Sequence, residues 1–155
     1  MIPTTIEAHL RQHHGGYKHT THRWAVTAQE LAAVEHVRGK KVAKPVVIRI
    51  AGKLALAVVA APHRVNLGVL EESIGATADL VPEQEFKAAF APCEPGAEPP
   101  LALFGLPIFV DEDLMMEPTL VMPAGTHEDA VELVTGEWIR CEGVQPVAGL
   151  GMAAH

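Results

Sequence analysis

The sequence is poor in residues on which several classes of protein depend. Its two cysteines, Cys93 and Cys141, form no C-x-x-C pair, and two are too few for a disulfide-stapled secreted fold or a zinc ribbon. We therefore expect reduced thiols. The single serine, Ser73, is not part of a G-x-S-x-G elbow, which nearly excludes a serine hydrolase.

Long apolar runs and nucleotide-binding motifs are missing as well. The longest apolar run, from Leu54 to Pro62, is less than half of the roughly 20 residues that a membrane-spanning helix needs. Residues 1–5 lack the basic start and apolar stretch of a signal peptide. There is no P-loop, no G-x-G-x-x-G after a strand and no H-E-x-x-H. We expect a cytoplasmic protein with no membrane partner.

The charge is unevenly divided along the chain. The 155 residues are 48% hydrophobic and carry a formal charge of −7, which suits one domain spanning 1–155 and argues against non-specific coating of nucleic acid. Residues 1–70, however, hold ten Lys and Arg against three acidic residues, whereas residues 71–155 hold two against sixteen. This asymmetry indicates a narrow basic face that could hold the end of a nucleic acid.

Hydrophobic periodicity predicts a mixture of helices and strands. Helices are expected over 6–14, 27–35, 66–74, 82–90 and 135–141, and strands over 42–50, 54–60, 77–81, 106–110, 119–122 and 130–134. Thr4 or Thr5 could cap the first helix, while Thr27 and Glu30 form a capping box. Residues 17–23 are expected to be extended, and the tail from Gly149 to be loose.

The order of these elements lacks the strict β-α-β alternation of a doubly wound fold. We therefore expect a single α/β domain in which helices flank a mixed, curved, barrel-like β-sheet.

Four histidines fall within ten residues, at His13, His14, His19 and His22. Imidazole binds zinc, copper and nickel, but no cysteine accompanies these four and no two of them have the i,i+4 spacing of a helical site. A polar segment with exposed histidines is the favoured interpretation, so no metal and no other cofactor is expected. Cys93 lies beside a carboxylate, which disfavours its thiolate form and favours a structural cysteine over a nucleophile.

Three places could build a binding site. Between Cys93 and Pro100, prolines and a glycine make a rigid loop whose backbone amides can point at a ligand, although a plain connection is the alternative. Residues 124–127 form a glycine turn after an apolar strand. Lys44 interrupts an apolar strand, where a buried ammonium group needs a partner. Alternatively it faces water from an edge strand, which Pro45 favours.

Six segments in a fixed order carry a resemblance to a known family. They are Thr27–Ala32, Ala43-Lys44, His63–Asn66, Cys93–Pro100, Gly105–Glu112 and Ala124–His127. Together they resemble the YbaK/prolyl-tRNA-synthetase-associated editing domain family, most clearly over residues 24–147. The resemblance implies the family's fold and a free-standing enzyme that hydrolyses mischarged aminoacyl-tRNA carrying a small amino acid such as Ala, Ser, Thr or Cys.

The resemblance also implies site residues. The family loop of a glycine, three variable residues and a proline matches Gly96 to Pro100, and the family's strand lysine matches Lys44. The implied catalytic residues are Lys44, Gly96 and Ala97. Backbone N–H groups of the two loop residues would stabilise the oxyanion, while the terminal ribose helps to position a water. The implied substrate-binding residues are Pro99, Pro100, Ala124, Gly125, Thr126, His127, His63 and Asp111.

The implied partners are the acceptor end of aminoacyl-tRNA and, as a further candidate, an aminoacyl-tRNA synthetase; DNA is not expected. Three residues depart from the family pattern: Pro45, where Thr is more frequent, Glu98, where an apolar residue is usual, and Pro123, where Asn or Ser is more frequent. A carboxylate at Glu98 would repel a phosphate, unless it faces solvent or binds the α-ammonium group of the substrate. These departures motivate the alternative of a non-catalytic module that binds tRNA or a synthetase.

Overall fold

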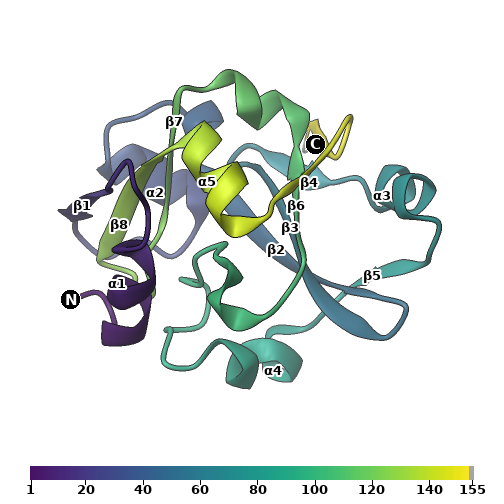
Figure 1. The fold of residues 1–155 in the computed structure, drawn as a ribbon, viewed down its shortest axis with the longest axis horizontal. Coiled ribbons are helices and arrows are strands. Elements are labelled where there is room, and N and C mark those ends of the chain that lie inside the picture. Colours follow the sequence, from purple (N-terminus) through teal and green to yellow (C-terminus); the bar gives the residue numbers. More distant parts are fainter. Residues whose placement is uncertain (154–155) are drawn as a thin grey trace.

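The computed structural model describes residues 1–153, in which strands form the centre and helices lie around them (Figure 1). The helices are α1 Thr4–Leu10, α2 Ala28–Val34, α3 Leu67–Ile74, α4 Glu83–Phe86 and α5 Thr135–Glu142. The strands are β1 Lys18–Thr21, β2 Ala43–Ile50, β3 Lys53–Ala60, β4 His63–Val65, β5 Ala78–Leu80, β6 Ile108–Asp111, β7 Thr119–Pro123, β8 Asp129–Val134, β9 Gln145–Val147 and β10 Gly151–Ala153.

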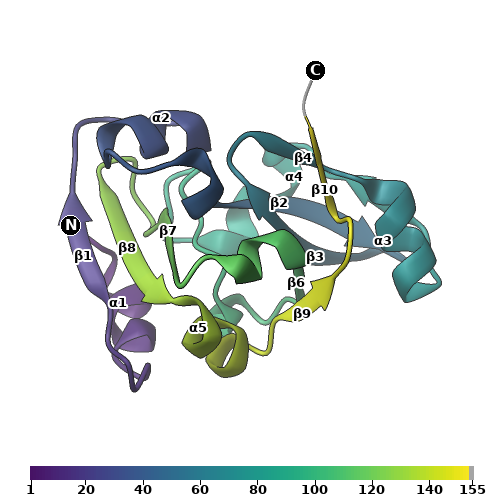
Figure 2. The same cartoon turned by 90° about the horizontal axis from the view of Figure 1, so that it is seen from above.

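The described strands are divided among three sheets. The largest is mixed and has the order β5-β2-β3-β6-β9. Strand β2 is antiparallel to β3, whereas β6 is parallel to both β3 and β9. An antiparallel β1-β8-β7 sheet lies beside it with α2 above, and β10 pairs with β4 (Figure 2). A bridge between Val42 and Val121 joins the two larger sheets. The expected mixed α/β fold is confirmed, without a closed barrel among the described strands.

Strand β3 is buried on both faces, which explains its unbroken apolar sequence. Leu56 and Val58 point into the main core, which also includes Trp138 of α5. The alternate residues, including Ala57 and Val59, point into a second core that α3 covers. Because side chains alternate along a strand, one apolar run supplies both cores.

Local capping signals place two helices correctly. The Thr27 side chain accepts from the Glu30 N–H while the Glu30 carboxylate accepts from the Thr27 N–H, which completes the predicted capping box. Asn66 caps α3 through the Val69 N–H, and Gly75 ends that helix in the left-handed conformation.

Three expectations about the elements were wrong. Helix α1 begins after Pro3 with no side-chain cap and ends at Leu10, so neither Thr4 nor Thr5 caps it. The helix expected over 82–90 divides into α4 and a 3-10 turn, Lys87–Phe90. The tail is held in place up to residue 153, because β10 pairs with β4 and Leu150 is fully buried; residues 154–155 lie outside the described part. None of the described helices combines the length and apolarity needed to cross a membrane.

Candidate functional site

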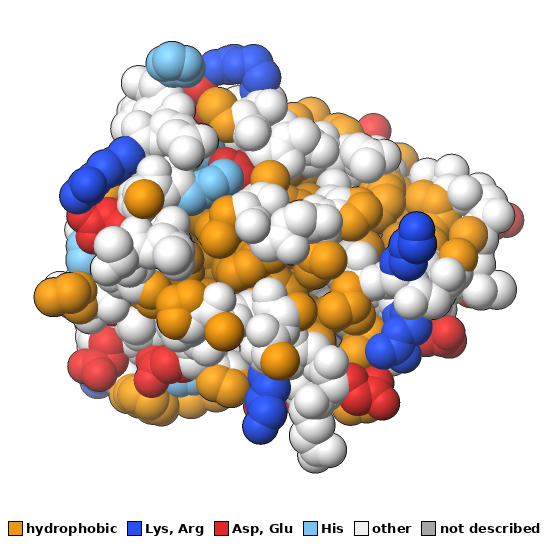
Figure 3. Space-filling view, turned by 60° about the horizontal axis from the view of Figure 1, so that its bottom comes forward, with side chains coloured by type: hydrophobic (Ala, Val, Ile, Leu, Met, Phe, Trp, Pro, Cys, Tyr) orange, Lys and Arg blue, Asp and Glu red, His pale blue; other side chains and the backbone are white. Residues whose placement is uncertain are grey.

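A pocket of about 780 Å³ lies between β2, the segment before α2, the loop 93–98 and the turn after β7. Its walls are mainly apolar, and the polar or charged side chains that reach it include Lys44, Arg64, Glu98, Thr126, His127 and Asp129. The face in Figure 3 shows apolar side chains gathered in the middle, with Lys and Arg side chains spaced singly around them. An apolar pocket with a few convergent polar groups is typical of a small-ligand site.

Two of the loops singled out by sequence meet at this pocket. The Glu94 N–H donates to the Gly125 carbonyl at 2.9 Å, and the Gly125 N–H donates to the Ala97 carbonyl at 2.8 Å. The Glu94 carboxylate accepts from the His127 N–H at 2.8 Å. Gly125 has a φ of +96°, and a Cβ there would lie 2.8 Å from Ile6 Cδ1, so the turn requires glycine. The loop and the turn therefore form one unit.

The amides that were expected to stabilise an oxyanion already have acceptors. The Gly96 N–H lies 2.9 Å from both carboxylate oxygens of Glu98, and the Ala97 N–H donates to the Glu94 carbonyl at 3.0 Å. Glu98 is 6% exposed, and burial raises the pKa of its carboxyl group. The Gly96 N–H is thus hydrogen-bonded to a carboxylate, while the Ala97 N–H is used in a hydrogen bond within the loop 93–98.

His127 stands directly beside Gly96. A Cβ built on Gly96, whose φ is +90°, would lie 3.3 Å from His127 Cε1. The His127 Nδ1 atom is 3.2 Å from the Ala25 carbonyl oxygen. Because a carbonyl can only accept, Nδ1 carries a proton, and in the neutral imidazole Nε2 is then the proton acceptor. Trp24, which sequence reasoning missed, packs against this imidazole with ring centroids 4.7 Å apart and the ring planes tilted by 50°.

Lys44 lines the pocket from β2. Strand β5 lies beside β2 only at Ile48–Ile50, so Lys44 occupies an uncovered stretch of strand, as the edge interpretation expected. Its ammonium group nevertheless donates to the carbonyls of Ala61, at 3.2 Å, and His63. Burial lowers the pKa of Lys44. The lysine is therefore held at the pocket wall by backbone acceptors.

Asp129 supports the turn that carries Thr126. Its carboxylate accepts from the Thr126 hydroxyl at 2.5 Å, and lies 2.6 Å from His19 Nε2 and 2.9 Å from the Met1 amino group. Burial acts to raise the pKa of Asp129, but these three hydrogen bonds outweigh burial and lower it to about 2. Asp129 lines the pocket, but no sequence motif identified it.

The other predicted residues do not line this pocket. Pro99 and Pro100 are buried behind the loop, where the Pro100 carbonyl accepts from the Trp138 indole at 2.9 Å. Ala124 and Gly125 shape the turn without lining the pocket. His63 and Asp111 pack against Gly151, with His63 Nδ1 and Asp111 Oδ2 both buried and unpartnered in the described structure. Arg64, the neighbour of His63, lines the pocket instead.

The environment of Cys93 agrees with its interpretation as a structural residue. Burial, together with the nearby Glu98 carboxylate, raises the pKa of the Cys93 thiol to about 12. Because the thiolate is the nucleophilic form, this thiol is unsuited to covalent catalysis.

Comparison with known proteins assigns the chain to a family. The sequence model of the aminoacyl-tRNA editing domain matches residues 22–141, which include β2, the loop 93–98 and the His127 turn. The chain belongs to the aminoacyl-tRNA editing domain family. Among curated protein sequences, no significant match was found.

Solved structures share the fold at low sequence identity. Hypothetical protein APE2540 is 19% identical, with a TM-score of 0.85 and coverage of 95% of this chain and 99% of that one. A candidate trans-editing enzyme for prolyl-tRNA synthetase is 20% identical, with a TM-score of 0.81 and coverage of 96% and 98%. A scaffold protein used for the computational grafting of epitopes is 22% identical, with a TM-score of 0.82 and coverage of 96% of both chains.

Proposed function

We propose that this protein is a free-standing aminoacyl-tRNA deacylase, which hydrolyses the ester of a tRNA mischarged with a small amino acid. The observation that carries the proposal is the convergence of Lys44, the Gly96–Glu98 loop and His127 on one pocket in a member of the editing family. We place the reaction in the cytoplasm, with the acceptor end of tRNA as the partner and an aminoacyl-tRNA synthetase as a further one.

Glu98 and Gly96 divide the recognition of the aminoacyl group between them. Without substrate, the Glu98 carboxylate accepts from the Gly96 N–H. The α-ammonium group of an aminoacyl ester is a stronger partner, because a hydrogen bond between two charged groups is stronger than one to a neutral amide. When Glu98 turns to that ammonium group, the Gly96 N–H becomes free for the ester carbonyl oxygen. The negative charge that develops on this oxygen is then stabilised by a fixed donor.

No protein nucleophile is required, because the aminoacyl ester is already activated. A water positioned with help from the terminal ribose hydroxyl attacks the carbonyl carbon. The His127 Nε2 atom, an acceptor while Nδ1 donates to Ala25, is suited to take the proton of this water. The ribose oxygen then leaves with a proton, and the products are the free amino acid and uncharged tRNA.

Lys44 and Arg64 bring positive charge to a pocket that must hold a nucleotide phosphate. One methyl group more or less changes binding by only about 1–3 kcal/mol. Rejection of the larger cognate amino acid must therefore be steric, and the apolar wall of the pocket excludes the larger side chain.

A second candidate function is supported by the occupied amides. Because the Gly96 and Ala97 N–H groups both have acceptors, a non-catalytic module that binds tRNA or a synthetase would also fit this loop. The test is a panel of tRNAs charged with Ala, Ser, Thr and Cys, with ester loss measured above the spontaneous rate. Accelerated deacylation of at least one member supports the enzyme, whereas binding of charged tRNA without turnover supports the module.

A further inference from the structure

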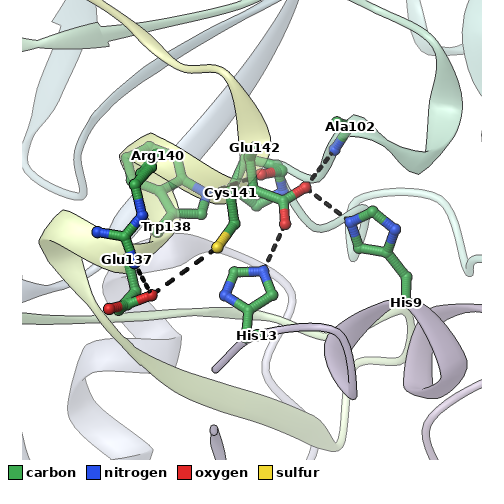
Figure 4. A network of polar contacts seen from close by, with 9 residues as sticks. His9, His13, Ala102, Glu137, Trp138, Arg140, Cys141 and Glu142 are labelled. Carbon is green, nitrogen blue, oxygen red and sulfur yellow. Dashed lines mark hydrogen bonds and ion pairs between the residues drawn. The ribbon is translucent and has the colours of Figure 1, made fainter. Parts of the chain in front are cut away.

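A second cluster of functional side chains joins α1 to α5. The Nε2 atoms of His9 and His13 contact the two carboxylate oxygens of Glu142, with 2.7 Å between His9 Nε2 and Glu142 Oε1. The Ala102 N–H donates to the same Oε1 at 2.6 Å. Figure 4 shows both imidazoles directed at this carboxylate from the α1 side. None of these residues lines the pocket.

A carboxylate as buried as that of Glu142 is costly unless it is paired, hydrogen-bonded or bound to a metal. The side chains of Glu142 and His13 are each 1% exposed. Among the described residues, its ion-pair partners are these two histidines, and no Lys or Arg contacts it. His13 Nδ1 is buried without a partner, and it carries a proton both in a doubly protonated imidazole and in one that binds a metal through Nε2. At the same cost in unsatisfied donors, a metal cation would bring positive charge to the carboxylate and bind both imidazoles at once.

The ligand set points to zinc. The candidate donor atoms all lie within 4.8 Å of one another. Two imidazoles and one carboxylate, with a fourth position open to water, form an established zinc ligand set. We propose that His9, His13 and Glu142 bind a Zn²⁺ ion. The His9 side chain is 19% exposed, so the ion and its water enter from that side. Zn²⁺ binds the Nε2 lone pair of each imidazole, and the proton of each ring then lies on Nδ1.

The position of the ion assigns it a structural role. The site connects the end of α1, the end of α5 and the Ala102 backbone. One turn earlier in α5, Trp138 holds the Pro100 carbonyl at the far end of the glycine-proline loop. The ion would therefore fasten α1 to the helix that supports this loop, and it would take no part in chemistry at the pocket.

The test is zinc binding by the full, untagged chain after removal of metals with a chelator. Equilibrium dialysis is expected to give one Zn²⁺ per chain. His9→Gln and Glu142→Gln should weaken affinity at least about tenfold, because even outer-shell changes weaken metal sites 10–100-fold. His14→Gln is the matched control, since His14 is exposed and outside the cluster.

Thermal unfolding gives a second measurement that needs no activity. Zn²⁺ should raise the Tm of the wild type and of His14→Gln clearly more than that of His9→Gln, whereas Mg²⁺, which prefers oxygen ligands, should leave the Tm of all three unchanged. Glu142→Gln replaces a buried carboxylate with an amide. If this variant fails to fold, the comparison of His9→Gln with His14→Gln tests the proposal, because His9 is partly exposed. The proposal is overturned if the wild type binds no zinc, or if His9→Gln and His14→Gln bind it equally.

Discussion

Gly96, Glu98 and His127 account for most of the site's chemistry within a few ångströms. Glu98 is nearly buried, accepts from Gly96 and has no Lys or Arg partner among the described ion pairs. Sequence could identify Glu98 as a departure from the family pattern, but not its hydrogen bond to the Gly96 donor. That contact depends on a left-handed backbone at Gly96, which is settled only in the folded loop.

The role of Glu98 predicts the effect of removing its charge. Glu98→Gln should lower kcat/KM for deacylation about 10–100-fold, since a hydrogen bond to a charged group contributes roughly 1.5–3 kcal/mol. A substrate whose α-amino group is acetylated should react slowly with the wild type and show little further loss with Glu98→Gln. If the variant hydrolyses both substrates as well as the wild type does, Glu98 does not recognise the ammonium group.

Gly96 can be tested against a glycine with similar backbone geometry. A Cβ at Gly96 would press against His127 at 3.3 Å, whereas a Cβ at Gly75, where φ is +69°, meets nothing within 4 Å. Both alanine variants carry left-handed strain of about 1–2 kcal/mol, so both should lose similar stability in urea unfolding. Only Gly96→Ala should lose deacylation in steady-state assays; an equal loss of activity in Gly75→Ala would mean that general destabilisation is responsible.

At the scale of elements, local signals predicted well and distant pairings did not. The α2 and α3 caps depend on residues three apart, and both are confirmed. Strand β10 pairs with β4, which is far away in sequence. The residues near the tail therefore contain no local signal that predicts its ordered structure. For the same reason the proposed zinc site could not be predicted from the sequence. His9 and His13 are four residues apart, but Glu142 lies near the other end of the chain.

Helix α2 provides a direct test of capping. Thr27→Ala should lower the free energy of unfolding by about 1 kcal/mol, because it removes the acceptor for the Glu30 N–H. Thr5→Ala is the control, since α1 has no side-chain cap, and it should change stability by no more than a few tenths of that amount. Chemical denaturation measures the free energy of unfolding of both variants. An equal decrease in the two would show that the α2 cap does not stabilise the protein.

At the scale of the whole molecule, the uneven charge is partly neutralised by folding. Three basic residues of the first half pair with acids of the second: Arg38 with Glu117, Lys41 with Glu132 and Arg49 with Glu85. Lys44 and Arg64 are outside these pairs and line the pocket. The basic face expected from sequence is therefore narrower than the composition implied, because sequence does not show which charges meet across the fold.

A narrow basic site predicts a moderate dependence on salt. Each phosphate neutralised releases counterions, with a slope of about −0.7 per contact for single-stranded nucleic acid. With Lys44 and Arg64 in contact, KM should rise about sevenfold between 50 and 200 mM salt, while kcat stays unchanged. Steady-state assays at fixed pH measure this, and a KM independent of salt would remove tRNA phosphate from the role proposed for these two residues.

The central claim is that this chain cleaves the ester of a mischarged tRNA. The most direct measurement is the single-turnover rate of amino-acid release from tRNAs charged with Ala, Ser, Thr or Cys, compared between the wild type and Lys44→Met. We expect the wild type to exceed spontaneous hydrolysis by a large factor on at least one of them, and Lys44→Met to lose most of that acceleration. Spontaneous rates on all four substrates with folded wild-type protein would contradict the account.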